Sequence, residues 1–236
     1  MHMYLCLKKH VIPNTKVNVE LKNIYRGDEV KFAALFRALQ PALLAEFLAA
    51  HPDFFSNNVL EGVIDYPIRD PATPTEQLKL WRGAGIKAPG GLSTMIERSQ
   101  AKYPVAYAMI QAFGNHCKSG GFSIVEPGGI IYRHTDVPAR QLRTANIHIP
   151  LYIPKGDLGF EVEGEISTWD DVFAFNNQKL HSVWNNTPER RLVFVFQLTR
   201  EFCGLPPADW TPGCNAHVPV FEKTLNPNYK PLTNLL

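Results

Sequence analysis

The sequence predicts an α+β protein, because two different residue patterns divide the chain near residue 120. Residues 28–117 carry apolar side chains at helical spacing, whereas the residues after 120 form short β-rich runs separated by turn residues. We therefore expect three parts: a mainly helical part with one or two strands over 1–120, a β core over 121–203, and an irregular, proline-rich tail over 204–236.

Helices are expected in the first part. The stretch "DEVKFAALFRALQ" places Val30, Ala33 and Phe36 near helical spacing, with acidic residues in the first turn. A proline inside a helix removes a hydrogen bond, so Pro41 is expected to begin a second helix, "PALLAEFLAAH". Pro104 begins another, "PVAYAMIQAFG", which ends at a glycine. The stretches "PIRDPATPTEQ" and "GAGIKAPGG" are expected to be loops.

The β core consists of seven short runs: "FSIVE", "GIIYRH", "ANIHIPLYI", "GFEVEGE", "VFAFNN", "HSVWNN" and "RLVFVFQLT". Short strands at this density are typical of an antiparallel sandwich or barrel. One or two further strands are expected from earlier residues, in 16–23 or 59–66. The last run is apolar at both odd and even positions, so we expect helices to cover its outer face.

Composition narrows the class of function. The formal net charge of +2, without a Lys/Arg block, gives no reason to expect a nucleic-acid partner or an anionic membrane. No apolar stretch reaches about 18 residues, and the first residues lack a secretory pattern, so we expect a cytoplasmic protein without a transmembrane helix. The four cysteines lack CxxC spacing and are expected to be buried free thiols. Cys203 and Cys214 are the one pair to consider as a disulfide.

Three side chains of the β core suggest a metal site. His134 and Asp136, separated by one residue, stand at the end of an expected strand, and His181 begins a later strand. Two imidazoles and one carboxylate can occupy one face of an octahedral ion, which is the ligand set of non-haem Fe(II) oxygenases. Either histidine alone would more commonly be a core residue, and Asp136, close to Pro138, could instead serve a turn.

Arg191 begins an otherwise apolar strand, and a buried guanidinium needs a partner. Its planar shape matches a carboxylate, so an acidic ligand would explain it, and the hydroxyl of Ser123 could donate to the same carboxylate. The adjacent Arg190 faces the other way and is expected to be a solvent-exposed charge.

The stretch from Phe122 to Arg200 resembles the aspartyl/asparaginyl β-hydroxylase family of Fe(II)/2-oxoglutarate-dependent dioxygenases. The similar segments are "FSIVEPGGIIYRHTD", "NIHIPLYIP" and "STWDDVFAFNNQKLHSVWNNTPERRLVFVF". The resemblance implies a double-stranded β-helix, a jelly-roll of the cupin type, with the helical half packed on one sheet. It also implies that the protein uses Fe(II), 2-oxoglutarate and O2 to hydroxylate an unactivated C–H bond of an amino acid, free or within a peptide.

The resemblance assigns roles residue by residue. His134 and His181 would bind iron, and Asp136 would complete the triad. Arg191 and Ser123 would hold the distal carboxylate of 2-oxoglutarate. His148 would lie near the metal-chelating end of 2-oxoglutarate. The alternatives are that His148 is a core histidine and that Ser123 is a sheet-surface residue.

Substrate contacts are expected on the connection that follows the first metal ligands. Arg140 and Arg143 could hold a substrate carboxylate, or belong to a solvated loop. Asn146 stands where the family has an arginine, so substrate identity is not inherited. Because a carboxylate stands at position 136, where some members have glycine, we expect hydroxylation in place of halogenation.

Two alternatives remain open at this point. One is a cupin-like metalloenzyme that does not use 2-oxoglutarate, which would need no counter-charge at Arg191. The other is a non-catalytic β-sandwich binding module in which the histidines are structural.

Overall fold

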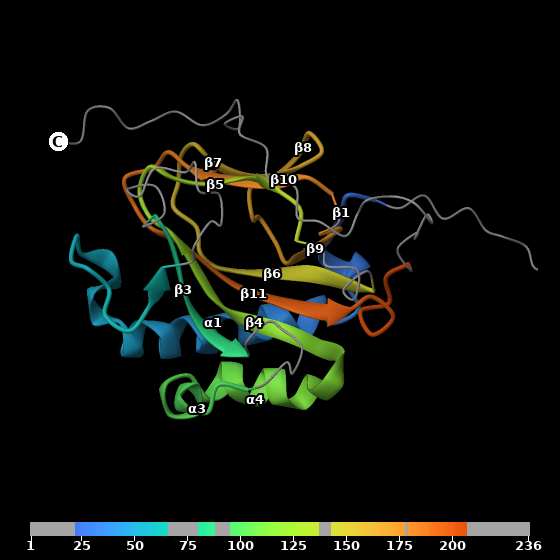
Figure 1. Ribbon diagram of the computed structural model, residues 1–236, viewed down its shortest axis with the longest axis horizontal. Coiled ribbons are helices and arrows are strands. Elements are labelled where there is room, and N and C mark those ends of the chain that lie inside the picture. Colours follow the sequence, from blue (N-terminus) through green and yellow to red (C-terminus); the bar gives the residue numbers. More distant parts are fainter. Residues whose placement is uncertain (1–21, 66–79, 88–94, 137–142, 178, 207–236) are drawn as a thin grey trace, which may run out of the picture.

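Two antiparallel sheets face each other, and helices cover the outer side of the larger one (Figure 1). The computed structural model describes residues 22–65, 80–87, 95–136, 143–177 and 179–206. The larger sheet has seven strands in the order β1-β9-β6-β11-β4-β3-β2, and the smaller has four in the order β5-β10-β7-β8. The α+β jelly-roll prediction is confirmed, with the helices packed on one sheet.

The elements have the following bounds. The strands are β1 (Ile24–Arg26), β2 (Ile64–Asp65), β3 (Trp81–Lys87), β4 (Cys117–Val125), β5 (Gly129–His134), β6 (Thr144–Tyr152), β7 (Leu158–Val162), β8 (Glu165–Ser167), β9 (Phe173–Phe175), β10 (His181–Asn185) and β11 (Arg191–Thr199). The helices are α1 (Ala33–Ala50), α3 (Arg98–Lys102) and α4 (Pro104–Phe113), with 3-10 turns η1 (Gly27–Glu29), η2 (Pro52–Phe55) and η3 (Gly114–His116).

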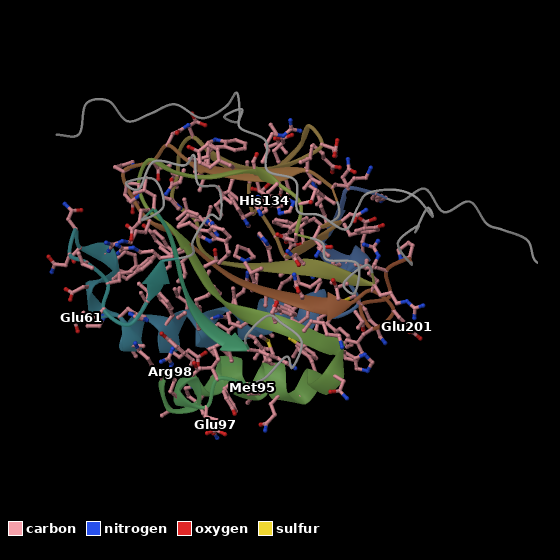
Figure 2. All side chains as sticks on the ribbon, in the orientation of Figure 1. Glu61, Met95, Glu97, Arg98, His134 and Glu201 are labelled. Carbon is pink, nitrogen blue, oxygen red and sulfur yellow. The ribbon has the colours of Figure 1, made fainter. Side chains whose placement is uncertain are left out.

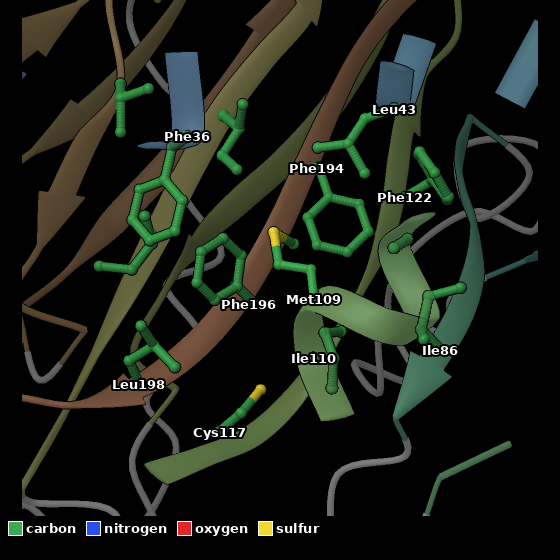
Figure 3. Close-up of a cluster of buried hydrophobic side chains, with 14 of the residues drawn as sticks. Phe36, Leu43, Ile86, Met109, Ile110, Cys117, Phe122, Phe194, Phe196 and Leu198 are labelled. Carbon is green, nitrogen blue, oxygen red and sulfur yellow. The ribbon is translucent and has the colours of Figure 1, made fainter. Parts of the chain in front are cut away.

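The central strand β11 is buried on both faces, as its sequence predicted. Leu192, Phe194, Phe196 and Leu198 belong to the core under α1 and α4, and Figure 3 shows three of them against Met109 and Ile110. Val193 belongs to a second core between the two sheets. Because side chains alternate along a strand, Arg191 lies on the same inner face as Val193.

Pro41 does not begin a second helix; it lies inside one helix, α1, so that prediction is wrong. Phe36, Leu43 and Phe47 are fully buried on both sides of it, whereas Pro41 itself is exposed. Packing of the apolar face against the sheet therefore outweighs the lost backbone hydrogen bond.

By length and mean hydropathy α1 could also cross a membrane. Two of its charged side chains instead bind other parts of the fold. Arg37 donates to both carboxylate oxygens of Asp171, and Glu46 accepts from the backbone N–H groups of Val105 and Ala106.

The first part of the chain supplies more strand than expected. β2 lies within the predicted 59–66. Of the predicted 16–23, residues 16–21 lie outside the described residues, and β1 begins just after this range. β3 overlaps a stretch predicted to be a loop. Glycine lowers strand propensity in isolation, which misled that prediction. In the sheet, a Cβ on Gly121 would lie 2.4 Å from the carbonyl oxygen of Ala84, so the close approach of β3 and β4 requires glycine there.

Cys117 and Cys203 are buried free thiols, as predicted. Cys214, and with it the proposed pairing to Cys203, lies outside the described residues, as does nearly all of the predicted tail.

Candidate metal centre

Sheet register brings the two predicted metal histidines together. β5 and β10 pair antiparallel with His134 directly opposite His181, and the ring centroids are 4.3 Å apart. Asp136 follows the end of β5, and its Oδ1 lies 3.3 Å from Nε2 of His134 and 3.6 Å from Nε2 of His181. One ligand atom from each residue lies within 4.8 Å of the others, so the three can hold one ion. Figure 2 shows His134 between the two sheets.

Both imidazoles present Nε2 to the position that a shared metal ion would occupy. Nδ1 of His134 lies 2.6 Å from the carbonyl oxygen of Tyr132, and Nδ1 of His181 lies 2.9 Å from that of Lys179. A carbonyl oxygen only accepts, so Nδ1 carries the proton in each ring. Nε2 of each ring then carries the lone pair that can bind a metal, an arrangement typical of metal-binding histidines.

Two asparagines orient the carboxylate. The Asn146 side chain donates to Oδ2 of Asp136, and Asn177 Nδ2 donates to Asn146 Oδ1 at 3.3 Å. The backbone N–H of Asp136 also donates to the carbonyl oxygen of Asn177 at 3.0 Å. Asn177 was not predicted as a site residue, and its only signal in the sequence is the pair of polar residues that ends the run "VFAFNN".

The ionised carboxylate of Asp136 makes this cluster suited to a cation. Burial opposes ionisation of Asp136, but the neighbouring His181 and His134 outweigh it and hold the pKa of the carboxyl well below its usual range. Burial likewise opposes protonation of His134, but the hydrogen bond and charge of Asp136 raise its pKa overall. Two nitrogens and one carboxylate oxygen with further positions open are the donor set that suits Fe(II).

Arg191 is buried, and no described residue supplies a counter-ion. It is 1% exposed, and the one side-chain hydrogen bond it makes within the described part of the chain, from Nη1 to the carbonyl oxygen of Ser123, is long at 3.5 Å. Its Nε has no partner, and within the described residues no carboxylate forms an ion pair with it. Burial lowers the pKa of Arg191 to about 9. An uncompensated guanidinium of this kind is suited to a carboxylate ligand.

Ser123 and His148 lie on the same inner face as Arg191. Ser123 Oγ accepts a 3.1 Å hydrogen bond from Trp81 Nε1, which leaves its hydroxyl hydrogen able to donate. Nδ1 of His148 accepts a 3.0 Å bond from Trp169 Nε1. Burial, and then the charge of Arg191, lower the pKa of His148 well below its usual range, so this imidazole is neutral.

The three residues predicted to contact substrate differ in where they lie. Arg140 lies outside the described residues, and Arg143 is exposed at the start of β6. Asn146 is buried, and its side-chain nitrogen is engaged by Asp136.

The prediction that Arg190 is a solvent charge is wrong, because it is only 8% exposed. Its Nε donates to Glu126 at 2.7 Å, and its other nitrogens donate to carbonyl oxygens of Asp53, Phe54, Ser56 and Asn58. The sequence did not reveal that this loop, distant along the chain, would lie over it.

The family model for aspartyl/asparaginyl β-hydroxylase matches residues 58–201. This chain belongs to that family. It is a 2-oxoglutarate-dependent non-haem iron hydroxylase, with Fe(II), 2-oxoglutarate and O2 as cofactor and cosubstrates, and the donor set described above fits the metal. No curated protein matches the chain.

Three solved structures are similar to the hydroxylase at low identity. A 2OG-Fe(II) oxygenase-family oxidoreductase from Burkholderia pseudomallei is 12% identical, with a TM-score of 0.45 and coverage of 75% of this chain and 93% of that one. A Pseudomonas putida prolyl-4-hydroxylase is 13% identical (TM-score 0.39; coverage 75% and 92%). A Trichoplax adhaerens prolyl hydroxylase, in complex with a hypoxia inducible factor peptide fragment, is 14% identical (TM-score 0.40; coverage 71% and 81%). The family assignment rests on the family model alone.

Proposed function

We propose that His134, Asp136 and His181 bind the Fe(II) of this hydroxylase and that Arg191 binds the distal carboxylate of 2-oxoglutarate. The substrate in this proposal is an amino acid, free or within a peptide. The observation that carries it is the pairing of a three-ligand cluster with a buried guanidinium that has no counter-ion among the described residues.

Each protein group has a defined task in the proposed reaction. Arg191 neutralises and orients one end of the diacid, with help from the hydroxyl of Ser123. His148, neutral and with Nδ1 already accepting, can donate from Nε2 to an oxygen of the other end. Bound iron supplies the activation of O2, coupled to conversion of 2-oxoglutarate to succinate and CO2. The aromatic side chains Phe160, Phe173 and Phe175 keep bulk water away from the inner face.

The proposed substrate class is supported by the description of the family and by polar groups near the metal ligands. Arg143 is exposed just before β6, and its guanidinium is suited to a substrate carboxylate. The side-chain nitrogen of Asn146 already donates to Asp136, so a contact with substrate would share this donor or replace that bond.

The test begins without oxygen. Fe(II) and 2-oxoglutarate should together produce the weak visible charge-transfer band of a chelated complex, and His181→Ala should abolish it. His116→Ala, at an exposed histidine that contacts Thr199, is the matched control and should retain the band. In air, a panel of amino acids and peptides should then identify the substrate by succinate release.

The outcomes separate the alternatives. A band that persists in His181→Ala removes that residue from the metal site. Metal binding that is indifferent to 2-oxoglutarate favours a cupin-like enzyme of another kind. No metal binding at all favours a non-catalytic binding module.

A further inference from the structure

Trp169 has an unusual backbone for a large side chain. It lies in the turn between β8 and β9 with φ of 59°, in the left-handed region, and its side chain is 2% exposed. Glycine adopts this conformation freely, but a bulky residue does so only at a cost in free energy. Such residues persist where the surrounding structure fixes them, and they cluster at functional sites.

The turn around Trp169 is fixed from several sides. Asp171 accepts a 2.7 Å bond from the backbone N–H of Val172 and is held by Arg37 of α1 at 2.7 and 2.9 Å. The carbonyl oxygen of Val172 accepts from the N–H of Gly27 at 2.8 Å. These contacts tie the turn to both α1 and η1, so the indole has little freedom to move.

The indole contacts two of the three inner-face residues that are predicted to bind the cosubstrate, His148 and Arg191. Its N–H donates to Nδ1 of His148 at 3.0 Å, and the two ring planes are only 8° apart, which is compatible with a hydrogen bond in the plane of both rings. The bond leaves the His148 proton on Nε2. The guanidinium carbon of Arg191 lies 4.9 Å from the centroid of the same indole, within cation–π range.

We propose that Trp169 is a positioning residue for 2-oxoglutarate, because its N–H fixes the tautomer of His148 and its ring face holds the guanidinium of Arg191. The proposal rests on the proposed role of Arg191 as the cosubstrate ligand. A tryptophan that only filled the core would not need a left-handed backbone or contacts to two polar side chains of one site.

Trp184 is the matched comparison. It is also buried, at 4% exposed, and its N–H donates to Asp157 Oδ1 at 3.0 Å. Its ring packs against Gly159, where an added Cβ would lie 2.3 Å from it. As the neighbour of Val183, which faces the core between the sheets, it projects from the other face of β10.

The experiment measures 2-oxoglutarate affinity in the anaerobic Fe(II) complex, from the charge-transfer band. Trp169→Phe keeps a ring face but removes the N–H, and should raise the dissociation constant about five- to ten-fold. Trp169→Leu also removes the ring and should raise it about 20- to 50-fold. Neither should change the affinity for Fe(II), and Trp184→Phe should change neither constant.

A second readout needs no metal or cosubstrate. Long-range 1H–15N spectra of the apoprotein should show His148 as the Nε2–H tautomer, and Trp169→Phe should convert it to a mixture of tautomers. Unchanged 2-oxoglutarate affinity in both Trp169 variants would overturn the proposal, as would an equal loss in Trp184→Phe. If the wild-type protein gives no band, the cosubstrate assignment itself fails, and the role of Trp169 fails with it.

Discussion

The buried charge of Arg191 should lower the unfolding free energy of the apoprotein. Burial lowers the pKa of this guanidinium by several units from its usual range, to about 9. Each pKa unit corresponds to about 1.36 kcal/mol, so the native state loses up to about 5 kcal/mol by keeping the side chain charged. A cosubstrate carboxylate would offset this loss in the complex, but the apoprotein has no equivalent partner among the described residues.

Arg191→Met keeps a long side chain and removes the charge. Since methionine gives up the contact with the Trp169 ring, we expect a net gain of about 2–4 kcal/mol in the unfolding free energy of the apoprotein. For a chain of this size that gain corresponds to a rise in Tm of about 5–15 °C. The same variant should lose 2-oxoglutarate binding, so stability would increase at the expense of function.

The pH dependence follows from the direction of the shift. Because the native pKa is lower than the unfolded pKa, the unfolded chain binds more protons from about pH 9 up to the usual pKa range of arginine. The contribution of Arg191 therefore becomes less unfavourable as pH rises through that window, and it is fully unfavourable below it. A measurement at pH 7 detects the whole effect.

Urea unfolding of apoprotein variants provides the assay, with Arg190→Met as the matched control. Arg190 is adjacent in sequence and also buried, but it is bonded to Glu126 and to loop carbonyl oxygens. Its replacement leaves those groups without a donor and should cost about 3–5 kcal/mol. With Fe(II) present and oxygen absent, 2-oxoglutarate at 100 times its dissociation constant should stabilise the wild type by about 2.7 kcal/mol and Arg191→Met by nothing. A destabilised Arg191→Met apoprotein would refute the reasoning.

Two further predictions concern the metal carboxylate and acid stability. Asn146→Leu removes the donor to Asp136 Oδ2 and should weaken Fe(II) binding about 10- to 100-fold in an anaerobic titration; unchanged affinity would show that Asn146 does not orient the carboxylate. His51, hydrogen-bonded to Tyr103, has its pKa lowered to about 4 by burial and by the charge of Lys102. The unfolded chain therefore binds more protons between pH 4 and 6.5, and stability falls as pH drops through that window by up to about 3 kcal/mol. His51→Gln should reduce this loss in urea titrations at pH 7 and pH 4, and an unchanged loss would contradict the assignment.

The clustering of His134, Asp136 and His181 could be predicted from the sequence because strand geometry makes it local. His134 and Asp136 follow one strand end, and His181 begins the strand that pairs with it. The inner-face position of Arg191 could also be predicted, because side-chain alternation along an apolar strand leaves few options. These features depend on residue spacing within elements, which a sequence displays directly.

The features that were missed depend on tertiary contacts. Pro41 is accommodated inside α1 because three buried phenylalanine and leucine side chains dock the helix on the sheet. β3 is a strand because β4 pairs with it, although its own glycines argue against one. The burial of Arg190 depends on the loop that bears Phe54. In each case a partner far away in sequence outweighs the local preference.

Trp169 shows how far sequence reasoning extends at this site. It is buried, as a core tryptophan is. The left-handed backbone, the bond to His148 and the contact with Arg191 depend on a turn that Arg37 holds through Asp171. Arg37 lies in the helical half of the chain, outside the β core. The helices therefore do more than cover a sheet: through this ion pair α1 fixes the residue that orients the predicted cosubstrate contacts, which connects the helical half to the chemistry of the β core.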